Sequence, residues 1–219
     1  MRRFLRNNGL ALFMFGLFFG ALVPMSITGH RSDNSDLKDH HRATITYWQY
    51  LGSGHFIEGV FENWESEFLQ MGTYVLATVW FFQKGSPESK DPEEASPQDV
   101  DPRRQRYPDP PWPVRRGGLA LKLYMNSLAL ALFALFVVSF VLHAIGGTSE
   151  YNQTQREHGG RPVSVTTFVT TSDFWYQSFQ NWQSEFLSVG VLIVLGIVLR
   201  QHGSPESKPV GAPHRQTGG

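Results

Sequence analysis

The stretch that decides the fold occurs twice in this chain, as FENWESEFLQMG at residues 61–72 and as FQNWQSEFLSVG at residues 179–190. Each copy is followed by an apolar run, and each run ends in the hexapeptide GSPESK, at residues 85–90 and 203–208. A shift of 118 positions aligns the two halves without a gap. Because a repeat at a fixed period constrains the architecture more than any local signal does, we predict a duplicated unit that contains two apolar segments.

The apolar segments have the composition of membrane-spanning helices. The first covers residues 9–27 and carries no charge, and the third covers residues 123–145 with only His143 as an ionisable group. A helix of about 20 apolar residues crosses a bilayer. The second and fourth segments, 68–82 and 186–199, are shorter and become long enough only if their helices begin near residues 61 and 179. The sequence therefore predicts an all-α integral membrane protein with four transmembrane helices arranged as two tandem parallel-repeat helical hairpins.

Two other interpretations of these segments were open. Arginines at positions 2, 3 and 6 before an apolar run resemble a secretory signal peptide, but the repeat partner of this run lies in the middle of the chain, where a signal cannot be. The shorter segments also resemble buried helices of a soluble protein. A soluble core requires a polar face on each helix, and the second half of each segment lacks one.

Positive charge predicts the orientation of the spans. The N-terminal end, the middle linker and the tail together hold 14 Lys and Arg residues, and the two other loops hold 5. Since cytoplasmic loops carry the excess of positive charge, both termini and the linker are expected in the cytoplasm, at the inner membrane. We predict a first two-helix repeat at 1–84, a proline-rich cytoplasmic linker at 85–116, a second repeat at 117–202 and a disordered cytoplasmic tail at 203–219.

Composition argues against several classes of site. The chain has no cysteine, so neither a disulfide nor a thiolate metal site is available. The formal net charge is zero, which gives no sign of a nucleic-acid partner. Histidines at positions 30, 40, 41 and 55 match no metal-binding spacing. We therefore expect no metal and no cofactor, and the absence of a nucleophile elbow or a phosphate-binding glycine loop predicts that the protein is not an enzyme.

The repeated motif reads as an amphipathic helix start. At helical spacing, the aromatic residues fall on one face and the Asn, Ser and Glu residues on the other. One interpretation places Trp64 and Trp182 as interfacial anchors at headgroup depth. The other is an ion or proton site, because two carboxylates brought together by a pseudo-two-fold axis resist ionising together. The candidate residues for that site are Glu67, Glu185, Asn63, Asn181, Ser66 and Ser184.

The hexapeptide also allows two interpretations. Its glycine suits the end of a helix, and its Ser-Pro-Glu suits the cap of a short following turn. Six identical residues exceed what capping requires, so a recognition patch for a partner is the alternative. The residues concerned are Gly85, Ser86, Pro87 and Glu88 in the first copy, and Gly203, Ser204, Pro205 and Glu206 in the second.

The motifs NWESEF and NWQSEF, each followed by an apolar run and GSPESK, resemble a bacterial family of small integral membrane proteins known only as a domain of unknown function. The resemblance covers nearly the whole chain except the linker and tail, and it implies a membrane location without any activity or catalytic residues. We expect a structural or partner-binding membrane protein, in contact with the lipid bilayer and with a second copy or another membrane protein. The alternative is a small transporter or channel with a paired-carboxylate proton or cation site.

Overall fold

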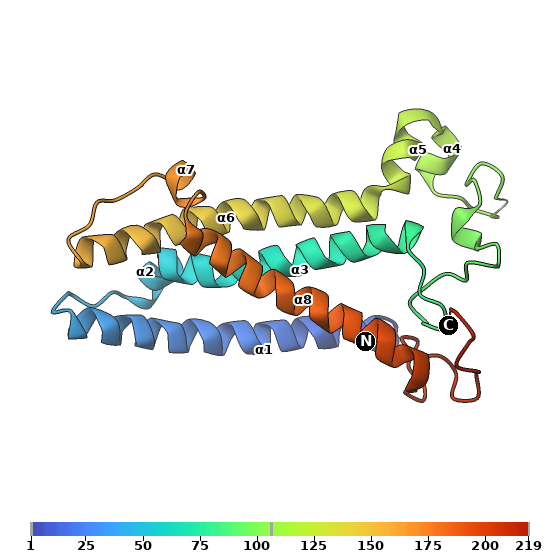
Figure 1. Cartoon of the computed structure of the whole chain (residues 1–219), viewed down its shortest axis with the longest axis horizontal. Coiled ribbons are helices and arrows are strands. Elements are labelled where there is room, and N and C mark those ends of the chain that lie inside the picture. Colours follow the sequence, from blue (N-terminus) through green and yellow to red (C-terminus); the bar gives the residue numbers. More distant parts are fainter. Residues whose placement is uncertain (1, 106, 219) are drawn as a thin grey trace. The chain divides into compact units, whose positions relative to one another are not determined.

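The computed structural model describes residues 2–105 and 107–218, and this part of the chain is helical without any β-strand (Figure 1). The all-α prediction is confirmed. The elements in chain order are α1 (Arg2–Asp39), α2 (Tyr47–Leu51), α3 (Gly54–Trp80), the 3-10 turn η1 (Pro97–Asp99), α4 (Trp112–Arg116), α5 (Gly118–Met125), α6 (Ser127–Glu157), α7 (Val165–Phe168) and α8 (Ser172–Val198).

The helix boundaries follow the 118-residue offset. The helices α3 and α8 begin and end at equivalent positions, α2 and α7 begin at equivalent positions, and α1 and α6 end at equivalent positions. The same local chemistry starts the two short helices. The hydroxyl of Thr46 accepts the Gln49 backbone N–H, and the hydroxyl of Ser164 accepts the Thr167 N–H. Local structure therefore matches between the halves at these helix ends.

Three helices are long and apolar enough to cross a membrane: α1, α6 and α8. The expectation of four such helices was wrong for α3. This helix begins at Gly54, well before the apolar run, and its 27 residues include four glutamates. These residues lower the mean hydropathy of α3, so its length and composition alone do not identify it as a membrane-spanning helix.

The chain divides into two compact units, and each takes residues from both halves of the sequence. Unit 1 comprises Met1–Val60 and Leu142–Thr170. Here the first residues of α3 cross the end of α6 at glycines: a Cβ at Gly54 would lie 2.7 Å from the Gly146 carbonyl oxygen, and a Cβ at Gly146 would lie 2.6 Å from the Glu58 nitrogen. Glycine at both positions lets the two backbones approach closely.

Matched contacts hold the two loops of unit 1. The Asn34 side chain donates to the Ile45 carbonyl at 2.9 Å and accepts the Ile45 N–H at 2.7 Å. The Asn152 side chain makes the same pair of bonds to Val163, at 2.9 and 2.7 Å. Two buried aromatic side chains, Tyr50 and Phe168, lie against the equivalent glycines Gly29 and Gly147. Each loop is thus fastened back onto the helix that precedes it.

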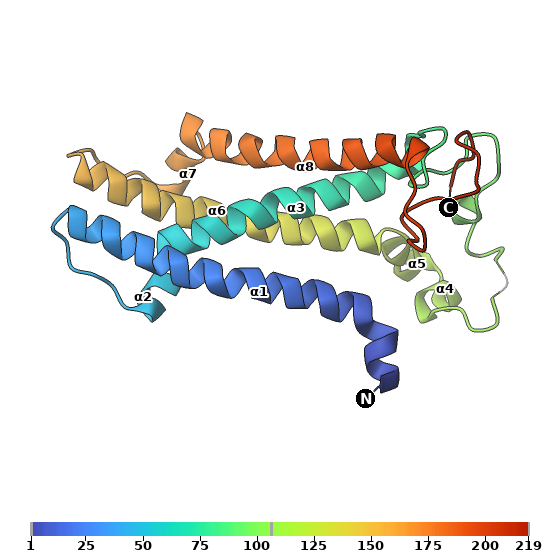
Figure 2. The ribbon, with the colours of Figure 1, turned by 90° about the horizontal axis from the view of Figure 1, so that it is seen from below.

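Unit 2 comprises Phe61–Val141 and Thr171–Gly219. Its three long segments belong to α3, α6 and α8; α3 and α8 run in the same direction and α6 runs in the opposite one (Figures 1 and 2). The Phe133 ring of α6 lies 3.2 Å from a Cβ placed at Gly72 of α3. Phe136 and Phe140 of α6 contact aromatic rings of α8. Aromatic packing therefore joins α6 to α8, and the absence of a side chain at Gly72 lets the Phe133 ring of α6 pack against α3.

Candidate functional site

Two acidic side chains of α3 meet hydrogen-bond donors of α8 within unit 2. The Trp182 indole N–H donates to the Glu65 carboxylate at 2.9 Å. One turn earlier, the Asn181 side-chain amide donates to the Glu62 carboxylate. The Glu65 side chain is fully buried, with 0% exposure. We call the contact formed by Glu62, Glu65, Ser178, Asn181 and Trp182 the α3–α8 seam.

Helical spacing places these residues on facing surfaces. Glu62 and Glu65 are three positions apart on α3, and Ser178 lies three and four positions before Asn181 and Trp182 on α8, so each set occupies one helix face. The Ser178 hydroxyl is buried, at 1% residue exposure, and has no hydrogen-bond partner in the described part of the chain. A buried hydroxyl without a partner is costly, so the seam has a polar group that is not satisfied by the protein itself.

The surroundings of the seam are apolar. Phe136 of α6 lies edge-on to Trp182 with ring centroids 6.3 Å apart, and Phe140 lies edge-on to the buried Phe174 at 5.3 Å. An ionised carboxylate is expensive in such surroundings unless it is paired. The Trp182 and Asn181 N–H groups supply hydrogen bonds to Glu65 and Glu62 in these surroundings.

The seam contains two of the residues predicted for the ion site or the anchors, Asn181 and Trp182. Of the others, Ser66 is buried at 1% exposure, and its hydroxyl bonds to the Asn63 carbonyl of its own helix. Ser184 is exposed and bonds in the same way to the Asn181 carbonyl. Trp64 is half-buried between Phe61 and Phe68, with ring centroids at 5.2 and 6.5 Å.

The predicted acidic pair is more open than the seam. Glu67 is exposed and Glu185 is half-buried, and the two carboxylates interact electrostatically. Asn63 is exposed as well. The most deeply buried acid of the motif is Glu65, not Glu67.

Sequence comparison between the halves missed Glu62 and Glu65 because they become Gln180 and Gln183 in the second copy. Residues that are identical at equivalent positions of the two copies have the same role in each copy. A contact between the copies instead joins two different, complementary groups. An acid in one copy and a donor one position away in the other is the signal that identifies such a contact. Glu62 faces the equivalent of residue 63, and Glu65 faces the equivalent of residue 64.

The two hexapeptides form the same turn. The glycines have positive φ angles, 87° at Gly85 and 82° at Gly203, a conformation that favours glycine. In both copies the first serine hydroxyl accepts the N–H of the glutamate at 3.2 Å, and the second serine hydroxyl accepts a backbone N–H at 2.9 Å. The helices end earlier, α3 at Trp80 and α8 at Val198, so the two glycines close separate turns that follow the helices. The expectation that these glycines terminate the helices was wrong.

The C-terminal tail covers the first hexapeptide, and Lys208 joins the two. Lys208 is buried, with 1% exposure, and its ammonium group donates to the carbonyls of Gly85, His214 and Gln216, the last two at 2.8 and 3.0 Å. Burial lowers the pKa of Lys208, and the charge of Arg200 lowers it further. Thr217 also accepts the Gly85 N–H at 3.0 Å. We call this arrangement the tail clasp.

Pro205 and Glu206 of the second hexapeptide remain exposed, whereas Ser86 of the first is fully buried. Pro87 packs against α8, where a Cβ at Gly196 would lie 3.0 Å from the proline ring. The first copy is therefore covered by other parts of the chain, and the second is the more exposed of the two.

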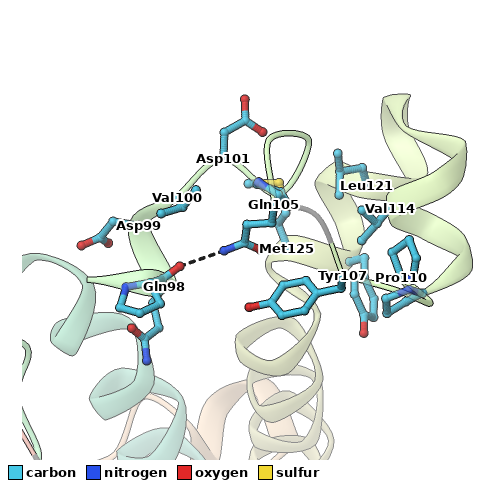
Figure 3. A pocket seen from close by; sticks show the side chains of 14 residues that line it. Gln98, Asp99, Val100, Asp101, Gln105, Tyr107, Pro110, Val114, Leu121 and Met125 are labelled. Carbon is cyan, nitrogen blue, oxygen red and sulfur yellow. Dashed lines mark hydrogen bonds between the residues drawn. The ribbon is translucent and has the colours of Figure 1, made fainter. Parts of the chain in front are cut away.

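A hollow of about 480 Å³ lies between the linker and the α4–α5 pair, also in unit 2 (Figure 3). The side-chain amide of Gln105 donates to the Pro97 carbonyl at 2.9 Å across it, and Tyr107, Val114 and Leu121 form its apolar wall. In the described residues, no group of three His, Asp or Glu side chains is placed to hold a metal ion. The hollow offers apolar surface but no catalytic constellation.

Comparison with known proteins agrees with the resemblance drawn from the motifs. Residues 1–219 match the family described as "Domain of unknown function (DUF6766)". The match includes the linker and the tail, which the resemblance had left out. No curated protein and no solved structure matches the chain. Since the family spans its whole length, the chain belongs to the DUF6766 family of unknown function.

Proposed function

We propose that this chain is a multi-pass protein of the inner membrane whose α3–α8 seam binds a proton. The observation that carries the proposal is the fully buried Glu65 carboxylate, which accepts the Trp182 N–H across two helices. Ionisable groups within membrane helices are functional candidates by default. In this proposal the protein binds a proton and is not an enzyme.

The burial pattern of α3 supports its role as a fourth span. Three of its polar residues lie inward, since Glu65, Ser66 and Gln70 are 0, 1 and 8% exposed, whereas Asn63 and Glu67 are exposed. A helix that buries its polar side chains against protein presents its apolar side to lipid, although its overall composition is too polar for recognition as a span. The matching helix boundaries and the parallel course of α3 and α8 support two parallel hairpin repeats.

The donors of the seam favour a proton over a metal cation. Trp182 and Asn181 both direct N–H groups at the carboxylates, and a cation would be repelled by these groups. A protonated carboxyl accepts such a bond and still has a proton to donate. The Ser178 hydroxyl is a nearby acceptor without a partner. Transport of protons or cations is the extension of this proposal, with the seam as the binding step.

Tryptophan fluorescence tests proton binding directly, because Trp182 bonds to the titrating group. We expect the emission of the detergent-purified protein to change in one step as pH is varied, and Glu65→Gln to remove that step. Asp173→Asn is the control, since Asp173 is an exposed acid on α8, and it should keep the step. A step that survives in Glu65→Gln, or a wild-type protein without any step, refutes proton binding at the seam.

The same titration separates a proton from a cation. Sodium or potassium chloride should leave the pH of the step unchanged if the site takes only protons, and should lower it if the metal ion competes. In proteoliposomes, Glu65→Gln should abolish any proton-dependent flux. A protein that binds a proton but carries no ion retains the binding proposal and loses the transport extension.

A structural or partner-binding role is the second candidate, favoured by the bare surface of the long helices. In their most apolar stretches, only 6% of the residues of α1 and none of those of α8 are buried within the chain. Lipid together with a second copy or another membrane protein would cover them. Crosslinking in membranes should give a discrete adduct, and a monomer alone at all protein-to-lipid ratios refutes self-association.

Topology follows from labelling, since the chain has no native cysteine. Single cysteines at Ser35 and Thr154 should react with an impermeant reagent added outside, and cysteines at Ser96 and Ser204 should not. Opposite labelling of Ser35 and Thr154 refutes the parallel repeats.

A further inference from the structure

A histidine at the start of α3 lies between two acidic side chains in unit 1. The His55 Nδ1 atom is 3.7 Å from the Asp33 carboxylate of α1 and 3.9 Å from the Glu150 carboxylate of α6. Both distances are too long for a hydrogen bond and within the range of charge attraction. His55 is thus placed to join α1 to α6 through the start of α3.

The side-chain exposure of His55 allows its imidazole to exchange protons with the solvent. The His55 side chain is 42% exposed, whereas the side chains of Asp33 and Glu150 are 9 and 30% exposed. The imidazole is therefore open to solvent while both carboxylates are more withdrawn. All three residues lie beyond the apolar stretches that end at residues 27 and 145.

Other charged and titratable groups around His55 are mostly acidic. Tyr50 of α2 lies with its ring centroid 6.0 Å from that of His55. Burial raises the pKa of Tyr50, and the charges of Asp33 and Glu150 raise it further. Asp36 of α1 and Glu157 of α6 add negative charge to the field at Glu150. Glu157 pairs with Arg42 on the loop side.

We propose that His55 is a proton-operated latch that tightens the contact of α1 with α6 when the medium outside becomes acidic. Histidine changes its charge in the physiological pH range. When His55 is neutral, two carboxylates of like charge face each other across it. When it is protonated, the imidazolium attracts both, and its N–H can shorten either contact to a charge-assisted hydrogen bond.

The latch joins the two halves, with Asp33 and His55 from the first and Glu150 from the second, and the repeat has no counterpart of it at the equivalent positions. At the equivalent positions of the repeat, His55 becomes Asp173, and Asp33 becomes Tyr151. The second half therefore has no counterpart of this trio, whereas the asparagine contacts to the loops occur in both. The latch is independent of the proton site proposed at the seam.

A double-mutant cycle at two pH values tests the latch. Melting temperatures of the purified full chain are compared for wild type, His55→Gln, Asp33→Asn and the double variant, at about pH 8 and about pH 5.5. Acidification should raise the melting temperature of the wild type relative to His55→Gln by about 2–4 °C. The coupling between the two substitutions should be present at the lower pH and vanish at the higher one.

His40→Gln is the control, since His40 lies in the same unit and its ring forms a hydrogen bond with the carbonyl of Asp36 of α1, at 2.8 Å. Equal pH profiles for wild type and His55→Gln overturn the latch, as does coupling of the same size at both pH values. Should Asp33→Asn not fold, hydrogen exchange of the wild type decides: protection of residues 30–37, corrected for the intrinsic effect of pH, must increase on acidification, and unchanged protection overturns the proposal.

Discussion

Replacement of Lys208 by Met tests the tail clasp. The substitution keeps most of the length of an unbranched side chain and removes the ammonium group. Three backbone carbonyls, those of Gly85, His214 and Gln216, then lose a donor. The Gly85 carbonyl loses it at a buried position, so water replaces the ammonium group only when the tail opens.

The size of the effect follows from these contacts. A hydrogen bond to a charged group contributes about 1.5–3 kcal/mol net, but burial of the ammonium group opposes this gain. We expect a net loss of about 2 kcal/mol in the free energy that holds the tail closed. Since 1.4 kcal/mol is a factor of ten, the open population should rise about 30-fold.

Hydrogen exchange followed by mass spectrometry measures this opening. Protection of residues 209–218 should fall by the same factor, whereas the helices keep theirs because the tail opens locally. Lys90→Met is the matched control: Lys90 is the last residue of the first hexapeptide, and its ammonium group donates to Val79 and Asp99, away from the tail. Unchanged protection in Lys208→Met, or an equal loss in Lys90→Met, refutes the clasp.

Three further predictions concern unit 1. Gly146→Ala places a Cβ 2.6 Å from the Glu58 nitrogen and should cost about 1–3 kcal/mol in thermal unfolding, whereas Gly190→Ala, with nothing within 4 Å of its Cβ, should not destabilise the protein. Asn34→Ala and Asn152→Ala should each lower stability by about 1–2 kcal/mol, because each removes two hydrogen bonds to a loop; since Asn34 also contacts the His30 Nε2 atom at 2.8 Å, a clearly smaller loss in Asn34→Ala than in Asn152→Ala contradicts the matched roles. The raised pKa of Tyr50 means that the folded state holds the phenol proton more tightly than the unfolded state. The contribution of this proton to the stability of the fold is complete below about pH 10 and is lost as pH rises further. The fall in melting temperature at alkaline pH should therefore be shallower in Tyr50→Phe than in the wild type.

Helix type could be predicted because it depends on local residues, but the starts of α3 and α8 were expected near residues 61 and 179 and lie at Gly54 and Ser172. Apolar runs and hydroxyl caps recur at equivalent positions, and the helices α3 and α8 begin and end in step as a result. The prediction of four apolar spans failed at α3, because this helix begins at Gly54, where the Ser53 hydroxyl accepts the Phe56 N–H, and the early start adds acidic residues to the segment.

Comparison of the two halves of the sequence could not predict the α3–α8 seam, for a different reason. Glu67 and Glu185 attracted attention because both copies keep them, yet Glu65 is the acid that packing buries. Burial depends on which face of α3 meets α8, and Glu65 and Glu67, two positions apart on a helix, point about 200° apart. The hexapeptides show the same distinction: their identical turns are local, whereas the tail reaches only one of them.

By itself, the sequence determined the all-helical class, the 118-residue repeat and the apolar character of α1, α6 and α8, since these follow from residue order and composition. Only the tertiary structure decided that Glu65 meets Trp182, that His55 lies between Asp33 and Glu150, and that Lys208 holds the tail. Each of these contacts joins unlike residues far apart in the chain. A search for residues identical in the two halves does not find such pairs, because packing selects complementary groups and duplication preserves identical ones.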